Sequence, residues 1–389
     1  MIKINLVNEE ELRQKHLDNL KPEVQKKLEE KISLEQNSDL GNLLMFLNEE
    51  IDVLLCGTPS DLISKIKYIE ENYFISEKKI TTILSRRGSV QNLKQDEKST
   101  LLTNFAQEEH LFNHLSEAAF FTAKQFEKEV NSLHKKEGKW SGYVETLKEI
   151  FNYDAFSKNK DGWGAYQLVT DLDISVCPYC NRSYITTLLR VENDDKQTRP
   201  ELDHYYPKSR YPYLALSFYN LIPSCSTCNG SFKGVADFYE EDAIHPYQEE
   251  FLGAATFKTD FNKKEPYDYR YLLGLSKDFK IILDINTKDE DLKGKINKTI
   301  YTFGLDRLYN THQDFVRDLI RNGIVNNKSR IDEIYDKFGD LFDNRDEELQ
   351  SVFLNYVNNQ DLGKRPLAKL TQDICKELGL LETQIDKDS

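Results

Sequence analysis

Four cysteines form two pairs with the same spacing, Cys177-Pro-Tyr-Cys180 and Cys225-Ser-Thr-Cys228. Each CxxC turn places two thiolates on one side of a tight loop, and two such turns complete the tetrahedron that Zn²⁺ prefers. The pairing and equal spacing speak against unrelated buried thiols, and the βαβ context of a thioredoxin-like redox pair is missing. The sequence therefore predicts a structural zinc site with four sulfur ligands.

An acidic residue next to a histidine lies between the cysteine pairs, at Asp203 and His204, and asparagines follow at Asn220 and Asn229. Phosphodiester hydrolysis needs a group that takes a proton from water, and a neutral imidazole suits that task. Carboxylate and amide oxygens are hard ligands that favour Mg²⁺ or Mn²⁺. If this segment is a strand, neighbouring side chains point to opposite faces. Asp203 can then hold a cation while His204 faces the attacking water.

Three segments together resemble the HNH (ββα-metal) endonucleases that are stapled by a zinc ribbon. They are CPYCNRSY at 177–184, ELDHYYPKSRYP at 201–212 and NLIPSCSTCNGSFKG at 220–234. The run that begins at His204 looks particularly like the HNH nucleases of bacterial anti-phage defence systems, of the Septu and retron-associated type. The resemblance covers roughly residues 160–250, well under half of the chain.

The resemblance implies a role for each polar residue of the motif. His204 would be the general base, and Asp203 with Asn229 would hold a catalytic Mg²⁺ or Mn²⁺. Asn220 would steady the loop that carries the base. Because Asn229 directly follows Cys228, the structural zinc would fix one ligand of the catalytic cation in space.

Basic residues flank the motif at Lys208, Arg210 and Lys233. They are candidates for contacts with nucleic-acid phosphates, which position a strand without reading its sequence. The alternative, ordinary surface charge, is nearly as well supported. His245, in the sequence IHPY, either touches substrate or has a structural role, and we favour the structural role.

The net charge of −14 is unusual for a protein that binds nucleic acid, because affinity comes largely from Lys and Arg. Residues 177–234 carry seven basic and five acidic side chains, so a net positive charge of 2 is local to the motif. An acidic remainder repels nucleic acid, which implies limited unspecific cutting or a partner that delivers the substrate. An ATPase or sensor protein is the partner that the resemblance suggests.

Outside the cysteine-rich segment, apolar residues recur at three- and four-residue steps, which indicates helices. These stripes are Leu40, Leu43, Leu44, Leu47, Ile51, Leu54 and Leu55; Leu115, Ala119, Phe126 and Val130; Leu305, Leu308, His312, Phe315 and Leu319; and Ile331, Ile334, Tyr335, Phe338, Leu341 and Phe342. Short β-prone pieces lie at 183–191 and 220–224.

We therefore expect an α+β, mostly helical protein in which a small ββα-metal HNH module with structural zinc is inserted between two helical regions. The predicted boundaries are 1–150 for the N-terminal helical domain, 151–260 for the nuclease module with its zinc knuckles, and 261–389 for the C-terminal helical domain.

The composition predicts a cytoplasmic protein. No apolar run reaches the length that spans a bilayer, and the first residues lack the apolar core of a signal peptide. Four of the six cysteines lie in CxxC pairs, which fits metal binding in a reducing compartment. Cys56 and Cys375 occur singly in helical patterns and are expected to be buried thiols.

The sequence leaves three functions open. The first is a metal-dependent endonuclease that hydrolyses DNA and acts in prokaryotic anti-phage defence. The second keeps the same site but cleaves RNA, because hydrolysis that does not use the 2′-hydroxyl works on either polymer. The third is a catalytically silent zinc ribbon that binds a partner protein. The presence of both Asp203 and His204 favours the enzymes, DNA more than RNA.

Overall fold

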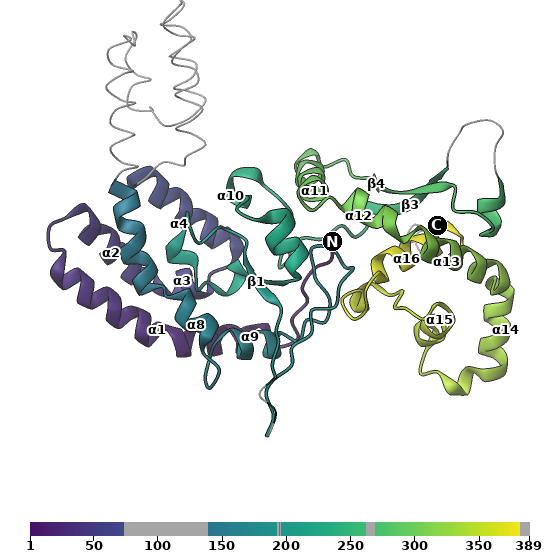
Figure 1. Cartoon of the computed structure of the whole chain (residues 1–389), viewed down its shortest axis with the longest axis horizontal. Helices are drawn as coiled ribbons and strands as arrows, with labels where there is room; N and C mark the ends of the chain where they lie inside the picture. Colours follow the sequence, from purple (N-terminus) through teal and green to yellow (C-terminus); the bar gives the residue numbers. More distant parts are fainter. Residues whose placement is uncertain (74–138, 193, 195, 262–268, 382–389) are drawn as a thin grey trace, which may run out of the picture. The chain divides into compact units, whose positions relative to one another are not determined.

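The computed structural model describes residues 1–73, 139–192, 194, 196–261 and 269–381. In this part of the chain helices predominate, and two antiparallel sheets have two strands each (Figure 1). The predicted class, α+β and mostly helical, is confirmed.

The described chain divides into two compact units, each made of segments that are separated in sequence. Unit 1 comprises Met1–His16, Asp154–Pro207 and Tyr219–Ser389, and unit 2 comprises Leu17–Tyr153 and Lys208–Phe218. The predicted boundaries at 150 and 260 stay a prediction.

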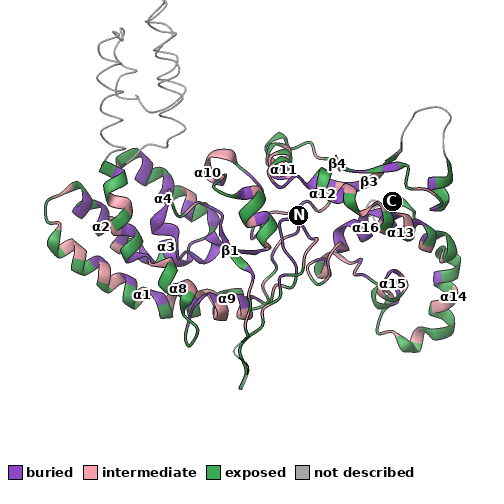
Figure 2. Cartoon of the chain, viewed as in Figure 1, coloured by how far each residue is buried: buried purple, intermediate pink, exposed green. Residues whose placement is uncertain are grey.

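Unit 2 is helical. Its helices are α1 (Glu9–Leu34, whose first turns belong to unit 1), α2 (Asp39–Glu49), α3 (Ile51–Cys56), α4 (Pro59–Asn72) and residues 139–150. The apolar stripe from Leu40 to Leu55 lies along α2 and α3 and is buried (Figure 2). Ser38 caps α2, and a capping box between Thr58 and Asp61 starts α4. The stripe from 115 to 130 lies outside the described residues.

The cysteine-rich part of unit 1 contains short elements. They are α8 (Tyr153–Lys158), α9 (Ala165–Leu172), β1 (Glu201–His204), β2 (Leu221–Ser224), the π-helix η3 (Thr227–Lys233) and α10 (Phe238–Glu241). The β-prone piece at 220–224 matches β2, whereas 183–191 makes only isolated bridges, such as Val176 to Tyr184. Strands β1 and β2 pair antiparallel, and η3 follows β2 almost directly.

The rest of unit 1 combines a second hairpin with helices. Its elements are β3 (Ala255–Phe261), β4 (Phe279–Ile285), α11 (Glu290–Phe303), α12 (Leu305–Tyr309), α13 (Gln313–Val325), α14 (Lys328–Phe338), α15 (Arg345–Phe353) and α16 (Ala368–Glu377). Helix α16 is buried from Ala368 to Cys375 and packs on β3 and α13 (Figure 2). The C-terminal apolar stripes lie on helices or on the 3-10 turns beside them, except Phe342, which follows η6 in extended conformation.

The expectation that the chain is helical after residue 261 was wrong for β4. In this strand Phe279 and Ile281 are buried while Lys280 and Ile282 are exposed, which is the period of two that a strand requires. The strand pairs with β3 along its whole length. The remaining short 3-10 turns are η1 (Pro212–Leu214), η2 (Phe218–Asn220), η4 (Tyr269–Leu273), η5 (Asn310–His312), η6 (Gly339–Leu341) and η7 (Asn359–Asp361).

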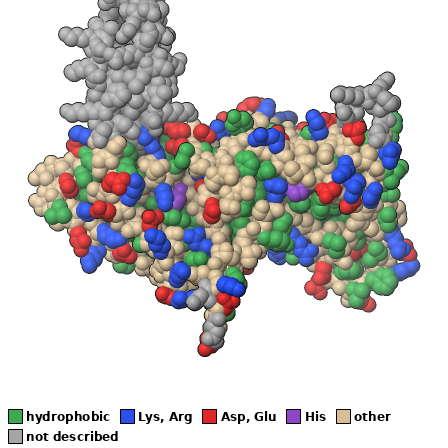
Figure 3. Space-filling model, in the orientation of Figure 1, with side chains coloured by type: hydrophobic (Ala, Val, Ile, Leu, Met, Phe, Trp, Pro, Cys, Tyr) green, Lys and Arg blue, Asp and Glu red, His purple; other side chains and the backbone are tan. Residues whose placement is uncertain are grey.

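In the described part of the chain, no helix combines the length and the apolar content that crossing a bilayer demands. On the face drawn in Figure 3, acidic and basic side chains are interspersed. Cys56 and Cys375 are buried in α3 and α16, as predicted from their helical patterns.

Candidate metal-centred site

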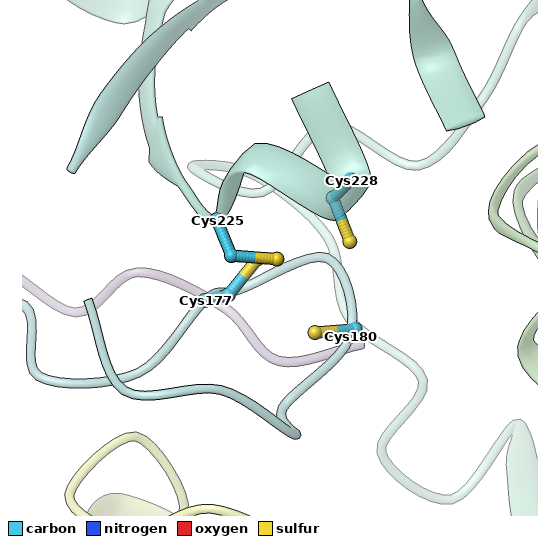
Figure 4. A group of neighbouring side chains, drawn as sticks. All are labelled: Cys177, Cys180, Cys225 and Cys228. Atoms are coloured by element: carbon cyan, nitrogen blue, oxygen red, sulfur yellow. The ribbon is translucent and has the colours of Figure 1, made fainter. Parts of the chain in front are cut away.

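The two cysteine pairs meet in unit 1. The four sulfur atoms lie within 4.8 Å of one another and point toward a common centre (Figure 4). Zn–S bonds of about 2.3 Å place tetrahedral sulfurs about 3.8 Å apart, so a modest contraction accommodates zinc. Cys177, Cys180 and Cys228 are buried and Cys225 is partly exposed. The four-cysteine metal site predicted from the spacing is therefore present as a cluster that can bind a metal such as zinc.

The electrostatics of the cluster also call for a cation. Burial raises the pKa of the Cys177 thiol well above its usual value. Hydrogen bonding among the four sulfurs, with Cys177 first, lowers the pKa of Cys225 and raises that of Cys228. Four thiolates that are buried together repel one another and lose their hydration, so they need a compensating positive charge. A divalent ion supplies that charge.

The first knuckle is a tight turn anchored to the C-terminal helices. The Asn181 amide donates to the Cys177 carbonyl at 2.8 Å, and Asn181 has a φ of +50°, which asparagine tolerates. The Asn181 side chain donates to the Leu362 carbonyl at 2.8 Å and accepts from the Lys369 amide at 3.0 Å. Tyr309 donates its hydroxyl proton to the Cys180 carbonyl at 2.6 Å. These contacts hold the C-terminal end of the knuckle, at Cys180 and Asn181.

The second knuckle is the junction between β2 and η3. The Asn229 amide donates to the Cys225 carbonyl at 3.0 Å, and the Gly234 amide donates to the Asn229 carbonyl at 2.8 Å. The latter bond spans five residues, the wide turn of a π-helix, which frequently occurs at functional sites. Gly234 ends the turn with a φ of +53°, a region that suits glycine.

Strand β1 carries the acidic residues and the candidate base. Asp203 is opposite Ile222 and His204 is opposite Leu221 in the antiparallel register. Alternation along the strand puts Glu201 and Asp203 on one face and His204 on the other. The presumed strand therefore exists, and it gives Asp203 and His204 different directions.

Both carboxylate oxygens of Asp203 have partners. Oδ2 accepts a hydrogen bond from the Tyr179 hydroxyl at 2.6 Å, and Oδ1 is 3.0 Å from Nζ of Lys233. Asp203 is 2% exposed. Burial raises its pKa, and the nearby Lys233 charge opposes that shift. Because Tyr179 lies between Cys177 and Cys180, this network joins the sulfur cluster to the acidic residue.

Asn229 contacts the same face of β1 one turn of η3 before Lys233. Its Nδ2 donates to Oε2 of Glu201 at 2.8 Å. Glu201, Asp203 and Asn229 together offer the hard oxygen donors that Mg²⁺ or Mn²⁺ prefers. The donor types therefore fit a divalent cation, whereas the oxygens of Asp203 are taken by Tyr179 and Lys233 in this arrangement.

His204 ends β1 and is 9% exposed. Its carbonyl accepts a hydrogen bond from Nζ of Lys233 at 2.7 Å. The loop after it is held by Asn220, which is fully buried. Oδ1 of Asn220 accepts from the Tyr206 amide at 2.6 Å, and its Nδ2 donates to the Tyr206 carbonyl at 3.1 Å. Asn220 thus clamps the backbone two residues beyond His204.

Among the other candidate residues, Lys233 lies at this site. Lys208, which is exposed, and Arg210, which is partly exposed, belong to unit 2. The side chain of Lys233 is 1% exposed and paired with Asp203, so this arrangement leaves its ammonium no open surface for a phosphate. His245 is buried, and its ring centroid is 4.1 Å from that of Tyr205.

Sequence reasoning missed Tyr179 and Glu201. Tyr179 had no signal of its own, because its partner Asp203 is 24 residues away and only the fold brings them together. Glu201 could have been found, because residues two apart on a strand share a face. Glu201 is two residues before Asp203, so a strand places both carboxylates on one face.

Comparison with known proteins gives partial similarities. The chain is 37% identical over 70 residues to Septu protein PtuB of Bacillus thuringiensis, which covers 18% of this chain and 23% of the relative. It is 30% identical over 103 residues to Protein ea31 of Escherichia phage lambda, which covers 26% of this chain and 30% of the relative. The aligned part spans less than a third of either relative's length. No protein-family model and no solved structure matches the chain.

Proposed function

We propose that the protein is a cytoplasmic, metal-dependent HNH endonuclease that hydrolyses DNA in prokaryotic anti-phage defence. The observation that carries the proposal is the order β1, β2, η3: Asp203 and His204 end the first strand, and the second cysteine pair leads into the helix that bears Asn229. The partial similarity to a Septu protein supports the defence role. A partner ATPase or sensor would compensate for the acidic body by delivering the substrate.

His204 is the general base of the proposed reaction. The neutral imidazole takes a proton from water as the water oxygen attacks phosphorus, and the bond from phosphorus to the leaving oxygen breaks. Asn220 holds the loop after His204 through its two hydrogen bonds to Tyr206, which limits the positions the imidazole can take. Zinc on the four cysteines is structural in this proposal, because four sulfur ligands leave no open position.

Asp203 and Asn229 are the proposed ligands of a catalytic Mg²⁺ or Mn²⁺. When bound, such a cation supplies positive charge that stabilises charge developing on the phosphate oxygens. Lys208 and Arg210 are the proposed phosphate contacts, since Lys208 is exposed and Arg210 is partly exposed.

A cleavage assay with matched histidine variants tests the proposal. Purified protein is incubated with supercoiled plasmid, linear duplex DNA and total RNA, each with Mg²⁺ or Mn²⁺. We expect plasmid to be nicked or cut, and His204→Gln to lower the rate by about 10²-fold or more, the usual worth of a general base. His312→Gln, a histidine on η5 that bonds Arg182, should retain the wild-type rate.

Each outcome of the assay distinguishes a function. Cleavage by His204→Gln at the wild-type rate would remove the proposed base. Cleavage of RNA but not DNA would keep the site and change the substrate. If the wild-type protein cuts neither polymer, the hydrolytic proposal fails for the chain acting alone.

A silent zinc ribbon that binds a partner protein is the second candidate. One observation favours it: Asp203 is buried and both its oxygens are engaged by Tyr179 and Lys233, as in a purely structural network. This candidate expects no cleavage by the wild-type protein, and it expects Asp203→Asn to change stability alone. The nuclease proposal expects the same variant to lose cleavage.

A further inference from the structure

Lys233 is a buried lysine whose charge is used inside the protein. Its side chain is 1% exposed, its Nζ is 3.0 Å from Oδ1 of Asp203, and it donates to the His204 carbonyl at 2.7 Å. The same nitrogen is 5.0 Å from the ring centroid of Phe238. Lysine is rarely this buried, because the desolvation of its ammonium must be offset by close partners.

The register between η3 and β1 places this ammonium at the acidic face. Asn229 and Lys233 are about one turn apart on η3, so both project toward β1. Their partners, Glu201 and Asp203, are two residues apart and share a strand face. Each helix residue thus meets one carboxylate, and the Lys233 ammonium occupies the coordination space of Asp203 on one side. The Tyr179 hydroxyl occupies the other side.

We infer that Lys233 is an internal counterion that competes with a divalent cation for Asp203. This inference rests on the proposed function, because it concerns the cation that Asp203 would hold there. In this arrangement the ammonium neutralises the buried carboxylate and, through the His204 carbonyl, holds the end of β1. A divalent cation reaches Asp203 only by displacing this ammonium, so Lys233 weakens metal binding and couples it to release of the strand end.

Metal affinity measured without any substrate tests this competition. Zinc-loaded wild-type protein and the Lys233→Met and Lys233→Gln variants are freed of other divalent ions by gel filtration and titrated with Mn²⁺. Free Mn²⁺ is followed by electron paramagnetic resonance. Removing a positive charge next to the ligand should lower the dissociation constant by about tenfold or more. The melting temperature of the variants should also rise more with Mn²⁺ than that of the wild type.

Two controls identify the oxygens and the lysine involved. Adding Asp203→Asn to Lys233→Met should abolish the gain in affinity, because the carboxylate is then gone. Lys298→Met, which removes a lysine paired with Glu241 on the surface of α11, should leave the Mn²⁺ dissociation constant unchanged.

Two results would overturn the inference. In the first, both Lys233 variants bind Mn²⁺ no more tightly than the wild type does. In the second, neither the wild type nor the variants bind Mn²⁺. If Lys233→Met does not fold, Lys233→Gln decides, because its amide can still donate to the His204 carbonyl. These measurements need no cleavage. Tighter Mn²⁺ binding in the Lys233 variants would therefore support the counterion role of Lys233, whatever the cleavage assay gives. Cleavage that survives His204→Gln would remove only the proposed base.

Discussion

His245 is a buried imidazole that should make stability depend on pH. It is 3% exposed, and burial, with a smaller contribution from Lys295, lowers its pKa to about 3. In the unfolded chain its pKa returns to about 6.5, so between these values the unfolded state binds more protons. The stability contributed by the neutral ring is complete above pH 6.5 and is lost as the pH falls toward 3. Between pH 7 and pH 5 the loss should be about 2 kcal/mol.

Urea unfolding of the wild type and His245→Phe at pH 7, 6 and 5 measures this loss. The phenyl ring can keep the contact with Tyr205 but cannot take a proton. We expect the wild type to lose about 2 kcal/mol more than the variant over this range. Parallel curves for the two proteins would mean that His245 stays neutral in both states or titrates equally in both.

At the scale of elements, the sulfur cluster joins a hairpin-like turn to a helix. The first knuckle and η3 are short, and the four cysteines are the contact that we expect to fix them together. Zinc binding is then also folding energy for this segment. We predict one tightly bound zinc per chain, and we predict that Cys225→Ser releases it. Hydrogen exchange should then show loss of protection at residues 175–185 and 225–234.

Zinc content by a colorimetric chelator and exchange by mass spectrometry provide the readouts. Cys56→Ala is the matched control, because this thiol is buried in α3 of unit 2 and should leave the zinc content at one. A Cys225→Ser protein that lacks zinc but keeps the wild-type protection pattern would refute the structural role of the metal.

These elements show which structural features could be predicted from the sequence and which could not. Cysteine spacing predicted the cluster because a CxxC turn is a local structure, and apolar periodicity predicted α2, α3 and the C-terminal helices for the same reason. Strand β4 was missed although its buried and exposed residues alternate, since its pairing partner β3 precedes it by some twenty residues. The partners of Asp203 were beyond reach, because only the tertiary fold brings Tyr179 and Lys233 to it.

At the scale of the whole molecule, charge distribution limits how nucleic acid can bind. The chain has 52 basic and 66 acidic residues, while the segment from 177 to 234 carries a small excess of basic ones. Two of these, Lys208 and Arg210, lie in unit 2, whereas His204 lies in unit 1.

This distribution predicts weak, shallow salt dependence of DNA binding. Each phosphate neutralised contributes about −0.9 to the slope of log affinity against log salt, so a few contacts give a slope of about −2 to −3. Lys208→Ala and Arg210→Ala should each reduce its magnitude by about one. Fluorescence anisotropy with a labelled duplex, from 50 to 200 mM KCl without divalent ions, measures the slopes.

Lys26→Ala, on an exposed turn of α1 in the same unit, is the control and should leave the slope unchanged. A slope that neither Lys208→Ala nor Arg210→Ala alters would place the phosphate contacts elsewhere on the chain.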